Sequence, residues 1–267
     1  MFIYPNAKIN IGLNIINKLK SGYHEIESCF CPVSLHDIIE VNISDKNHLT
    51  TSGIKINSDV SDNILIKCLK KFNSNKNFRI HLHKIIPIGA GLGGGSSDAA
   101  FLLNFLNYNS QIKLSYEKVL QIANDIGSDC PFFIENKKKY ITGTGNILNE
   151  INIDINNKSI IIVDPGKSIN TVEAYNNVLP NKPKYNLKDI LLNENIENWS
   201  NFIKNDFENF AFKKIKKLKK IKALLIKLGA EFVSLSGSGS CIYGIFNTDE
   251  INLIDLPYKS FKVKVIE

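Results

Sequence analysis

A glycine-rich segment between a predicted strand and a predicted helix constrains this chain more than any other part of its sequence. The segment reads Pro87-Ile88-Gly89-Ala90-Gly91-Leu92-Gly93-Gly94-Gly95-Ser96-Ser97-Asp98. Alternation from Arg79 to Ile86 predicts the strand, and apolar residues at 99, 102, 103 and 106 predict the helix. Glycines let a ligand approach the main chain, and a helix N-terminus attracts anions. The segment therefore predicts a phosphate-binding loop, and Ser96 or Ser97 can cap the helix and offer a hydroxyl to the ligand or a metal ion.

Two common phosphate-binding motifs do not explain this segment. A P-loop requires a lysine directly after its last glycine, and no lysine follows the glycines here. The dinucleotide pattern is present as Gly89, Gly91 and Gly94, but Glu117, the acid nearest the expected distance, lies in a predicted helix rather than at the end of a strand. The glycines therefore need another interpretation.

The composition predicts a globular protein of the cytoplasm. The chain of 267 residues is 43% hydrophobic, enough for one large domain or two smaller ones. No apolar run reaches the roughly 20 residues of a membrane helix, and the first residues do not resemble a signal peptide. The five cysteines follow no disulfide or zinc spacing, so we expect free, buried thiols.

The net charge of +7 raises nucleic-acid binding as an alternative function. Arg79 is the only arginine, whereas arginine usually dominates base recognition. Lysines are concentrated between Lys213 and Lys222, but no aromatic residues alternate with them to stack on bases. We expect a solvated helix face opposite a buried stripe made of Ile215, Leu218, Ile221, Leu225 and Leu228. The expected partners are therefore small molecules, without nucleic acid or membrane, and the chain is expected to be a monomer or a weak homodimer.

Periodicity predicts alternating strands and helices along the chain. Strands are expected over 2–18, 38–43, 140–155, 159–163, 231–235, 241–246 and 261–265. Helices are expected over 62–69, 115–126 and 207–228, and two further helices are expected to begin at about residues 171 and 187. The Asn-rich run around Asp154 to Lys158 is the predicted boundary between a domain of residues 1–155 and a domain of residues 156–267.

Several polar residues are open to two interpretations from their local sequence. Lys8 lies on the polar face of the first strand and is typical of a solvated lysine. Asp129, just before Cys130-Pro131, can satisfy turn amides or act chemically. His81 and His83 share a strand face, which allows a metal pair, but packing is favoured because no third ligand stands out.

The glycine segment resembles the phosphate loop of the GHMP kinases, which include galactokinase, homoserine kinase, mevalonate kinase and phosphomevalonate kinase. Further motifs agree in order: Pro5-Asn6-Ala7-Lys8-Ile9-Asn10, Gly22-Tyr23-His24, Asp62-Asn63, Gly127 to Phe133, Asp164-Pro165-Gly166 with Thr171 and Tyr175, and Ser236 to Ser240. Within that superfamily the chain is similar to the kinases of 4-diphosphocytidyl-2-C-methyl-D-erythritol, which belong to non-mevalonate isoprenoid biosynthesis. The Gly-Tyr-His turn distinguishes these from homoserine and mevalonate-pathway kinases, the alternative enzymes.

This resemblance implies an α+β, two-domain GHMP kinase fold, with a ribosomal-protein-S5-like amino-terminal domain and a ferredoxin-like carboxy-terminal domain. It implies transfer of the γ-phosphoryl group of ATP to the substrate 2-hydroxyl, giving the 2-phosphate and ADP. Carried over by motif, Asp129 is the catalytic base and Lys8 is its partner. A fixed carboxylate can accept the hydroxyl proton, and a cation offsets charge on the transferring group.

The resemblance also implies the ligand-binding residues. Tyr23 and Tyr175 sandwich the cytosine ring, His24 hydrogen-bonds its polar edge, and Asn10 contacts the substrate near Lys8. ATP is bound by Asn63, Lys84 and the segment from Pro87 to Ser97. Mg²⁺ is expected with ATP, held by phosphates, water and Ser97, since no acidic ligand is evident. The chain departs from its relatives at Asn146, where a glutamate is common, and in having no arginine to clamp the phosphate.

Overall fold

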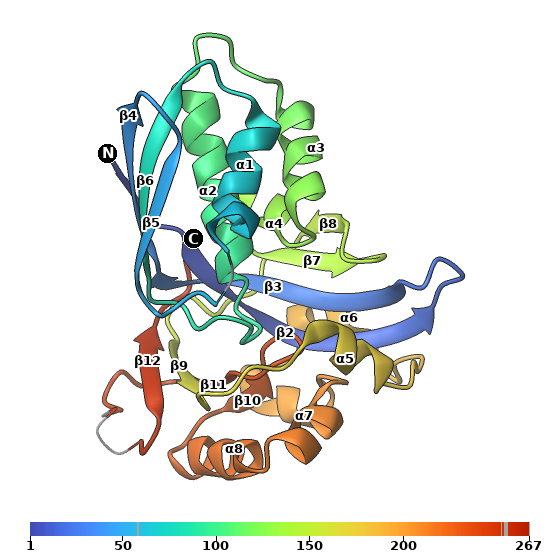
Figure 1. The fold of residues 1–267 in the computed structure, drawn as a ribbon. Helices are drawn as coiled ribbons and strands as arrows, with labels where there is room; N and C mark the ends of the chain where they lie inside the picture. Colours follow the sequence, from blue (N-terminus) through green and yellow to red (C-terminus); the bar gives the residue numbers. More distant parts are fainter. Residues whose placement is uncertain (58, 252, 254–255, 267) are drawn as a thin grey trace. The chain divides into compact units, whose positions relative to one another are not determined.

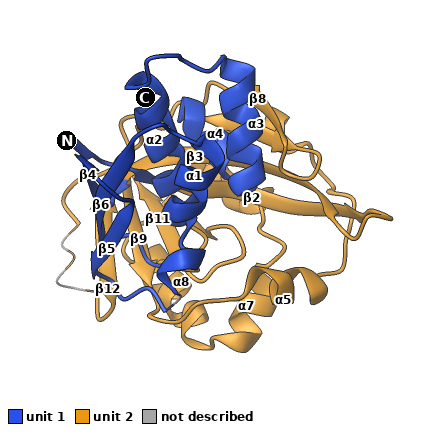
Figure 2. Cartoon of the chain, turned by 45° about the horizontal axis from the view of Figure 1, so that its top comes forward, with its two compact units in different colours: residues 1–7, 35–88, 93–136 blue, residues 8–34, 89–92, 137–267 orange. Residues whose placement is uncertain are grey.

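The computed structural model describes residues 1–57, 59–251, 253 and 256–266, which form two compact units (Figure 2). Unit 1 comprises Met1–Ala7, Leu35–Ile88 and Gly93–Asn136, and unit 2 comprises Lys8–Ser34, Gly89–Leu92 and Lys137–Glu267. The units divide the chain by compactness and differ from the expected domains, because residues 8–34 share a unit with the carboxy-terminal half. The boundary between residues 155 and 156 stays a prediction.

Unit 1 is built on a four-stranded sheet in the order β1-β4-β6-β5. Its strands are β1 (Phe2–Ile3), β4 (Ile38–Ser44), β5 (His48–Gly53) and β6 (Asn77–Lys84); β5 is parallel to β6 and the other pairs are antiparallel. The helices α1 (Ile64–Phe72), α2 (Gly94–Tyr108) and α3 (Tyr116–Ile126) lie beside this sheet, and α4 (Cys130–Glu135) follows them (Figure 1). The β5 strand was not predicted, because among its residues only Leu49 is buried and its sequence carries little alternation.

Two helices of unit 1 begin with a side-chain cap, and the helix after the glycines does not. Asn63, preceded by the short 3₁₀ helix η1 (Val60–Asp62), accepts a hydrogen bond from Leu65 N, and Ser115 accepts one from Lys118 N, as expected for N-caps. The helix predicted after the glycines is present as α2, but the expected cap by Ser96 or Ser97 is wrong, because the N-cap is Gly93, at φ 70°, and both serines lie inside the helix. A left-handed backbone at the cap suits glycine, so the helix begins earlier than serine capping would place it.

Unit 2 contains most of a sheet in the order β2-β3-β7-β8. Its strands are β2 (Asn6–Lys18), β3 (His24–His36), β7 (Lys139–Thr142) and β8 (Ile147–Glu150). The β3 strand was not predicted, because it is buried almost continuously and lacks the alternation of a half-exposed strand.

The second sheet of unit 2 is antiparallel, in the order β10-β11-β9-β12. It comprises β9 (Ser159–Asp164), β10 (Phe232–Leu235), β11 (Ile242–Phe246) and β12 (Lys259–Val263). The remaining elements of the unit are α5 (Thr171–Asn176), α6 (Leu187–Asn193), η2 (Ile196–Asn201), α7 (Glu208–Lys214) and α8 (Lys217–Lys227), of which α8 packs against β10 and β11. The mixed helix and sheet content agrees with the expected α+β class.

The single helix expected over 207–228 is two helices. Ile215 leaves the helical conformation at φ −124° and ψ 86°, while its side chain stays buried with Leu218, Ile221 and Leu225. Packing of these apolar residues therefore overrides the helical periodicity that joined them. All five cysteines are free and buried, as expected, and none of the helices in the described part of the chain is long and apolar enough to cross a membrane.

Candidate active site

Backbone hydrogen bonds fix the loop Gly89–Leu92 within unit 2. The carbonyl oxygen of Gly89 accepts from Ile169 N at 3.3 Å, and that of Ala90 accepts from Cys241 N at 3.1 Å. The carbonyl oxygen of Leu92 accepts from Lys8 N at 3.0 Å, which ties the loop to β2. Because these carbonyl oxygens already bond to the protein, amide groups are the loop's remaining main-chain groups for an anion.

Ser236, in the second glycine- and serine-rich loop, contacts both the first loop and β2. Its hydroxyl donates to Gly91 O at 2.8 Å and accepts from Asn10 N at 3.3 Å. Gly91 has φ +80°, and a Cβ atom there would lie 1.8 Å from Ser236 O. Only glycine fits this approach, so the two loops are built to pack main chain against main chain.

The start of α2, in unit 1, carries two buried polar atoms that have no hydrogen-bond partner in the described part of the chain. The Ser97 hydroxyl and Asp98 Oδ1 are buried and have no hydrogen bond within the described residues. A buried polar atom without a partner is costly, so such atoms in native proteins usually await a ligand or water. Ser97 therefore fits its expected role beside a triphosphate and its metal ion.

Asp98 also belongs to a buried ion cluster in unit 1. Lys84 Nζ donates to Asp98 Oδ2 at 2.7 Å and to Asp37 Oδ2 at 2.5 Å. Burial alone would lower the pKa of Lys84, but the charges of Asp98 and Asp37 outweigh burial and raise it. Burial raises the pKa of Asp98 to about 8, against the opposing effect of Lys84 and with a smaller contribution from Asp37.

The two residues predicted to perform the chemistry lie in different units. Lys8 is 3% exposed, so the interpretation as a solvated strand lysine is wrong. Its ammonium donates to Asn10 Oδ1 and lies 4.2 Å from the Phe30 ring centroid. Asp129 is half-buried at the N-cap of α4, and its side chain makes no cap hydrogen bond to that helix. The partnership of Lys8 with Asp129 stays a prediction.

The residues predicted to bind cytosine are partly brought together in unit 2. The rings of His24 and Tyr175 stack, with centroids 4.9 Å apart and an angle of 25° between planes. Phe207 packs edge-on against Tyr175 at 5.0 Å. Tyr23, at 68% exposure, lies on the surface next to His24. Burial, and then the charge of Lys18, lowers the pKa of His24, which favours the neutral imidazole.

The turn between β7 and β8 explains one departure from the relatives. Asn146 Oδ1 accepts hydrogen bonds from Thr144 N and Thr144 Oγ1, each at 3.0 Å. Gly143 lies at φ +65°, where a Cβ atom would be 2.7 Å from Asn146 Oδ1. The side chain of Asn146 is therefore used to hold this turn.

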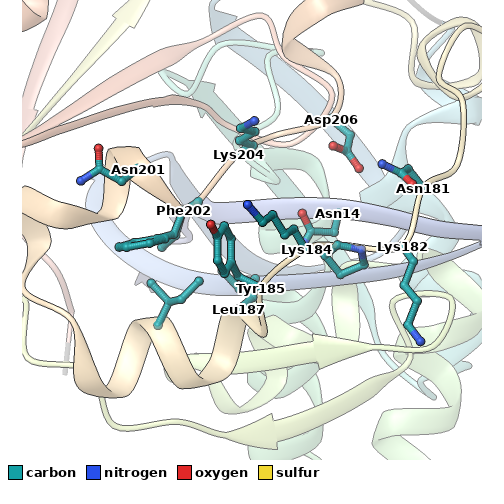
Figure 3. Close-up of a pocket in the computed structure, with 13 residues that line it drawn as sticks. Asn14, Asn181, Lys182, Lys184, Tyr185, Leu187, Asn201, Phe202, Lys204 and Asp206 are labelled. Atoms are coloured by element: carbon teal, nitrogen blue, oxygen red, sulfur yellow. The ribbon is translucent and has the colours of Figure 1, made fainter.

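A cavity of about 200 Å³ in unit 2 is separate from these residues (Figure 3). It is lined by Asn14 of β2 together with residues that include Lys184, Tyr185, Lys204 and Asp206. Asp206 accepts a hydrogen bond from Ile15 N at 2.7 Å, so this carboxylate fastens the backbone of β2. None of the predicted site residues is among those that line the cavity.

The histidine pair makes no metal site. His81 Nε2 and His83 Nδ1 both hydrogen-bond to Ser52 Oγ, at 2.8 and 2.9 Å. Within the described residues no group of three or more His, Cys, Asp or Glu side chains could hold a metal ion. These histidines link β6 to β5, in agreement with the favoured interpretation.

Comparison with known proteins identifies the family. A model described as GHMP kinases N terminal domain matches residues 63–137, and one described as GHMP kinases C terminal matches residues 185–254. The 4-diphosphocytidyl-2-C-methyl-D-erythritol kinase of Azobacteroides pseudotrichonymphae is 42% identical over 92% of this chain and 93% of its own length. The chain belongs to the 4-diphosphocytidyl-2-C-methyl-D-erythritol kinases of the GHMP family.

Solved structures agree with this family. A crystal structure of 4-(cytidine 5'-diphospho)-2C-methyl-D-erythritol kinase superposes with a TM-score of 0.83 at 26% identity, covering 99% of both chains. Mevalonate kinase of Methanococcus jannaschii, at 16% identity, superposes with a TM-score of 0.72 over 100% of this chain and 98% of that one, which shows the common GHMP fold.

Sequence reasoning missed several residues of this kinase's candidate site. Asp37 and Asp98 were not selected, although Asp98 directly follows Ser96 and Ser97, and neither was Ser28, which accepts from Asn10 Nδ2 at 3.0 Å. An acidic residue next to a phosphate loop was a usable signal, because it is costly there unless paired. No local signal marks Asp37, whose partner lies 47 residues away.

Proposed function

We propose that this kinase transfers the γ-phosphoryl group of ATP to the 2-hydroxyl of 4-diphosphocytidyl-2-C-methyl-D-erythritol, giving the 2-phosphate and ADP. The observation that carries the proposal is the 42% identity to a kinase of that name over almost the whole chain. The contact between His24 and Tyr175 supports it, because it brings together two of the residues expected to bind the base. We place the enzyme in the cytoplasm, acting on small molecules as a monomer or weak homodimer.

Asp129 is the proposed catalytic base, and Lys8 is the cation that acts with it. The substrate hydroxyl loses its proton as its oxygen bonds to the γ-phosphorus and the bond to the β-phosphate oxygen breaks, and a half-buried carboxylate can accept this proton. Most of the catalysis lies in positioning and charge neutralisation, because the transition state of phosphoryl transfer is loose. Lys8 suits the second task, since a buried ammonium is screened little by water.

The proposed ATP site consists of Asn63 and the segment from Pro87 to Ser97, with Lys84 beside the start of that segment. Loop amides and the N-terminus of α2 supply donors for the phosphates without positive side chains. The hydroxyl of Ser97, which has no hydrogen-bond partner among the described residues, is the proposed protein ligand of Mg²⁺. When bound, Mg²⁺ neutralises charge on the triphosphate.

The proposed cytidine site consists of Tyr23, His24 and Tyr175, with Asn10 on the methylerythritol side. Stacking on aromatic rings supplies affinity, whereas hydrogen bonds from a neutral His24 to the base edge select cytosine. Tyr23, which is 68% exposed, is the proposed second ring of the sandwich.

The decisive test measures ADP release from ATP with 4-diphosphocytidyl-2-C-methyl-D-erythritol, mevalonate or homoserine as acceptor. We expect turnover with the cytidine substrate alone, a phosphate on its 2-hydroxyl by ³¹P NMR, and loss of turnover in Asp129→Asn. Comparable kcat/KM on homoserine or mevalonate would reject the proposed substrate. Unchanged turnover in Asp129→Asn would reject the proposed base.

A further inference from the structure

Three charged side chains of unit 1 form a closed cluster next to the glycine segment. Asp37, Lys84 and Asp98 are 0%, 4% and 1% exposed. The Lys84 ammonium lies between the two carboxylates, at 2.5 Å from Asp37 Oδ2 and 2.7 Å from Asp98 Oδ2. Charged groups this deeply buried are costly unless they are paired and hydrogen-bonded, so the cluster is held together strongly.

The cluster joins the segments on both sides of the glycines. Asp37 Oδ1 accepts from Ile85 N at 2.5 Å and from Ile86 N at 2.9 Å, which fixes the backbone that enters the segment. Asp98 lies just beyond the first turn of α2, the helix that begins within the segment at Gly94. Asp37 itself, just before β4, is anchored by its amide to Pro5 O at 2.9 Å.

The Lys84 ammonium also lies directly against the start of α2. A Cβ atom on Gly94, the first residue of that helix, would be 3.0 Å from Lys84 Nζ and 2.8 Å from Ile86 Cγ2. Glycine at this position therefore lets the ammonium pack against the helix N-terminus. The position of the helix end then depends on where the cluster holds the ammonium.

We propose that Asp37, Lys84 and Asp98 are positioning residues that hold the entry to the glycine segment and the N-terminus of α2 in the geometry that binds the ATP triphosphate. This inference rests on the proposed function, because it takes the glycine segment as the ATP site. In this proposal Lys84 acts through Asp37 and Asp98. A lysine that bound the nucleotide directly would not need these carboxylates.

The two carboxylates of the cluster are held by different numbers of partners. Asp37 accepts from the backbone amides of Ile85 and Ile86 as well as from Lys84. Asp98 accepts from Lys84 through Oδ2, whereas its Oδ1 has no hydrogen-bond partner among the described residues. Asp37 is therefore the carboxylate that ties the ammonium to the backbone entering the glycine segment.

The test compares ATP affinity and steady-state kinetics of Asp37→Asn, Lys84→Met, their double variant and Asp98→Asn. Affinity is measured by calorimetry with a non-hydrolysable ATP analogue, a readout that does not need the phosphoryl acceptor. Lys71→Met is the matched control, because Lys71 lies in the same unit in an exposed ion pair with Asp125, at 3.4 Å.

Asp37→Asn and Lys84→Met are each expected to weaken binding of the analogue and raise the KM for ATP by about 10-fold to 100-fold, the size of effect that misplacement of a site produces. The KM for the cytidine substrate should stay within about 3-fold, and the double variant should be little worse than either single variant. Asp98→Asn should change ATP affinity by less than about 3-fold, because the amide oxygen can still accept from Lys84 in place of Oδ2, the one side-chain oxygen of Asp98 that has a partner among the described residues.

Two results would overturn the proposal. In the first, Lys84→Met weakens ATP binding while Asp37→Asn does not, as expected for a direct nucleotide ligand. In the second, the effects of the two variants add fully. If Lys84→Met fails to fold, the proposal is tested by the ATP affinities of Asp37→Asn and Asp98→Asn. Equal losses of affinity in these two variants would overturn the proposal, and a large loss in Asp37→Asn alone would support it. The proposed function would be rejected if the wild-type protein does not phosphorylate the cytidine substrate. The positioning role would still hold in that case if Asp37→Asn and Lys84→Met weaken ATP binding without adding to each other.

Discussion

The hydroxyl of Ser236 donates a hydrogen bond to the carbonyl oxygen of Gly91, 2.8 Å away, and so fastens the second glycine- and serine-rich loop to the first. The approach is so close that a side chain at Gly91 would overlap the main chain of Ser236. The shape of the loop that is proposed to bind phosphate is therefore determined by a loop about 145 residues further along the chain.

Gly91→Ala should destabilise the protein and impair ATP binding. The new Cβ would lie 1.8 Å from Ser236 O at a φ of +80°, so the backbone of both loops must shift. A strained backbone of this kind costs on the order of 1–3 kcal/mol before the clash is counted. Urea-induced unfolding and KM for ATP measure the two effects.

Gly95→Ala is the matched control for that variant. No atom lies within 4 Å of a Cβ built on Gly95, and this residue lies in α2. Alanine in a helix is favoured over glycine by roughly 0.5–1 kcal/mol, so this variant should keep or increase the free energy of unfolding. Equal destabilisation by both substitutions would contradict the close approach at Gly91.

Lys8→Met should lower kcat by about 100-fold or more, the usual effect of removing a group that stabilises transition-state charge. Methionine keeps the apolar stem beside Phe30 and removes the ammonium, so the fold should persist. Circular dichroism checks that the fold persists, and kcat measures the loss of turnover. Lys20→Met, at an exposed lysine just beyond β2, should leave both unchanged, and a similar loss of kcat in this control would contradict the assignment of Lys8.

The KM for the cytidine substrate should rise when the pH is lowered and should not rise when the pH is raised. The pKa of His24 lies below its ordinary value of 6.5, so the neutral ring is favoured in the folded protein. The unfolded chain takes up this proton first as the pH falls, so the associated stability is present above about pH 6.5 and is lost as the pH falls toward the folded pKa. Affinity should follow the same trend, because protonation removes the ring's acceptor.

Two variants check this assignment through KM measured against pH. His24→Gln should bind substrate more weakly and show no acid limb. Lys18→Met should move the acid limb to higher pH, because the charge of Lys18 contributes to lowering the pKa of His24. A wild-type acid limb that persists in His24→Gln would assign the titration to another group.

Local chemistry allowed much of the kinase to be predicted from its sequence. The helices that begin after Asn63 and Ser115 and the long β2 strand depend on neighbouring residues, so their own sequences specify them. The family motifs supplied Lys8, which its own strand would have left as a surface lysine. Local spacing of apolar residues failed at Ile215, where tertiary packing breaks a helix that the periodicity would continue.

The remaining features depend on contacts between distant residues. Continuous burial hides β3, since a strand covered on both faces has no alternation. The ion pairs of Lys84 with Asp37 and Asp98 join residues that are distant in the sequence, and no local pattern predicts them. The stacking of His24 on Tyr175 likewise joins β3 to α5, and no spacing in the sequence encodes that contact.

The lysine-rich region from α7 to α8 should behave as a solvated face over a buried stripe. Leu218 is fully buried, so Leu218→Ala should cost about 2–5 kcal/mol of the free energy of unfolding. Lys219 is exposed, and Lys219→Ala should change the free energy of unfolding by less than about 0.5 kcal/mol.

Lys214 and Lys222 already pair with Glu173 and Glu208, which reduces the positive charge offered to a nucleic acid. We therefore expect no binding to duplex DNA at about 50 mM salt, where counterion release would favour it, and binding that weakens steeply with added salt would instead assign this face to nucleic acid.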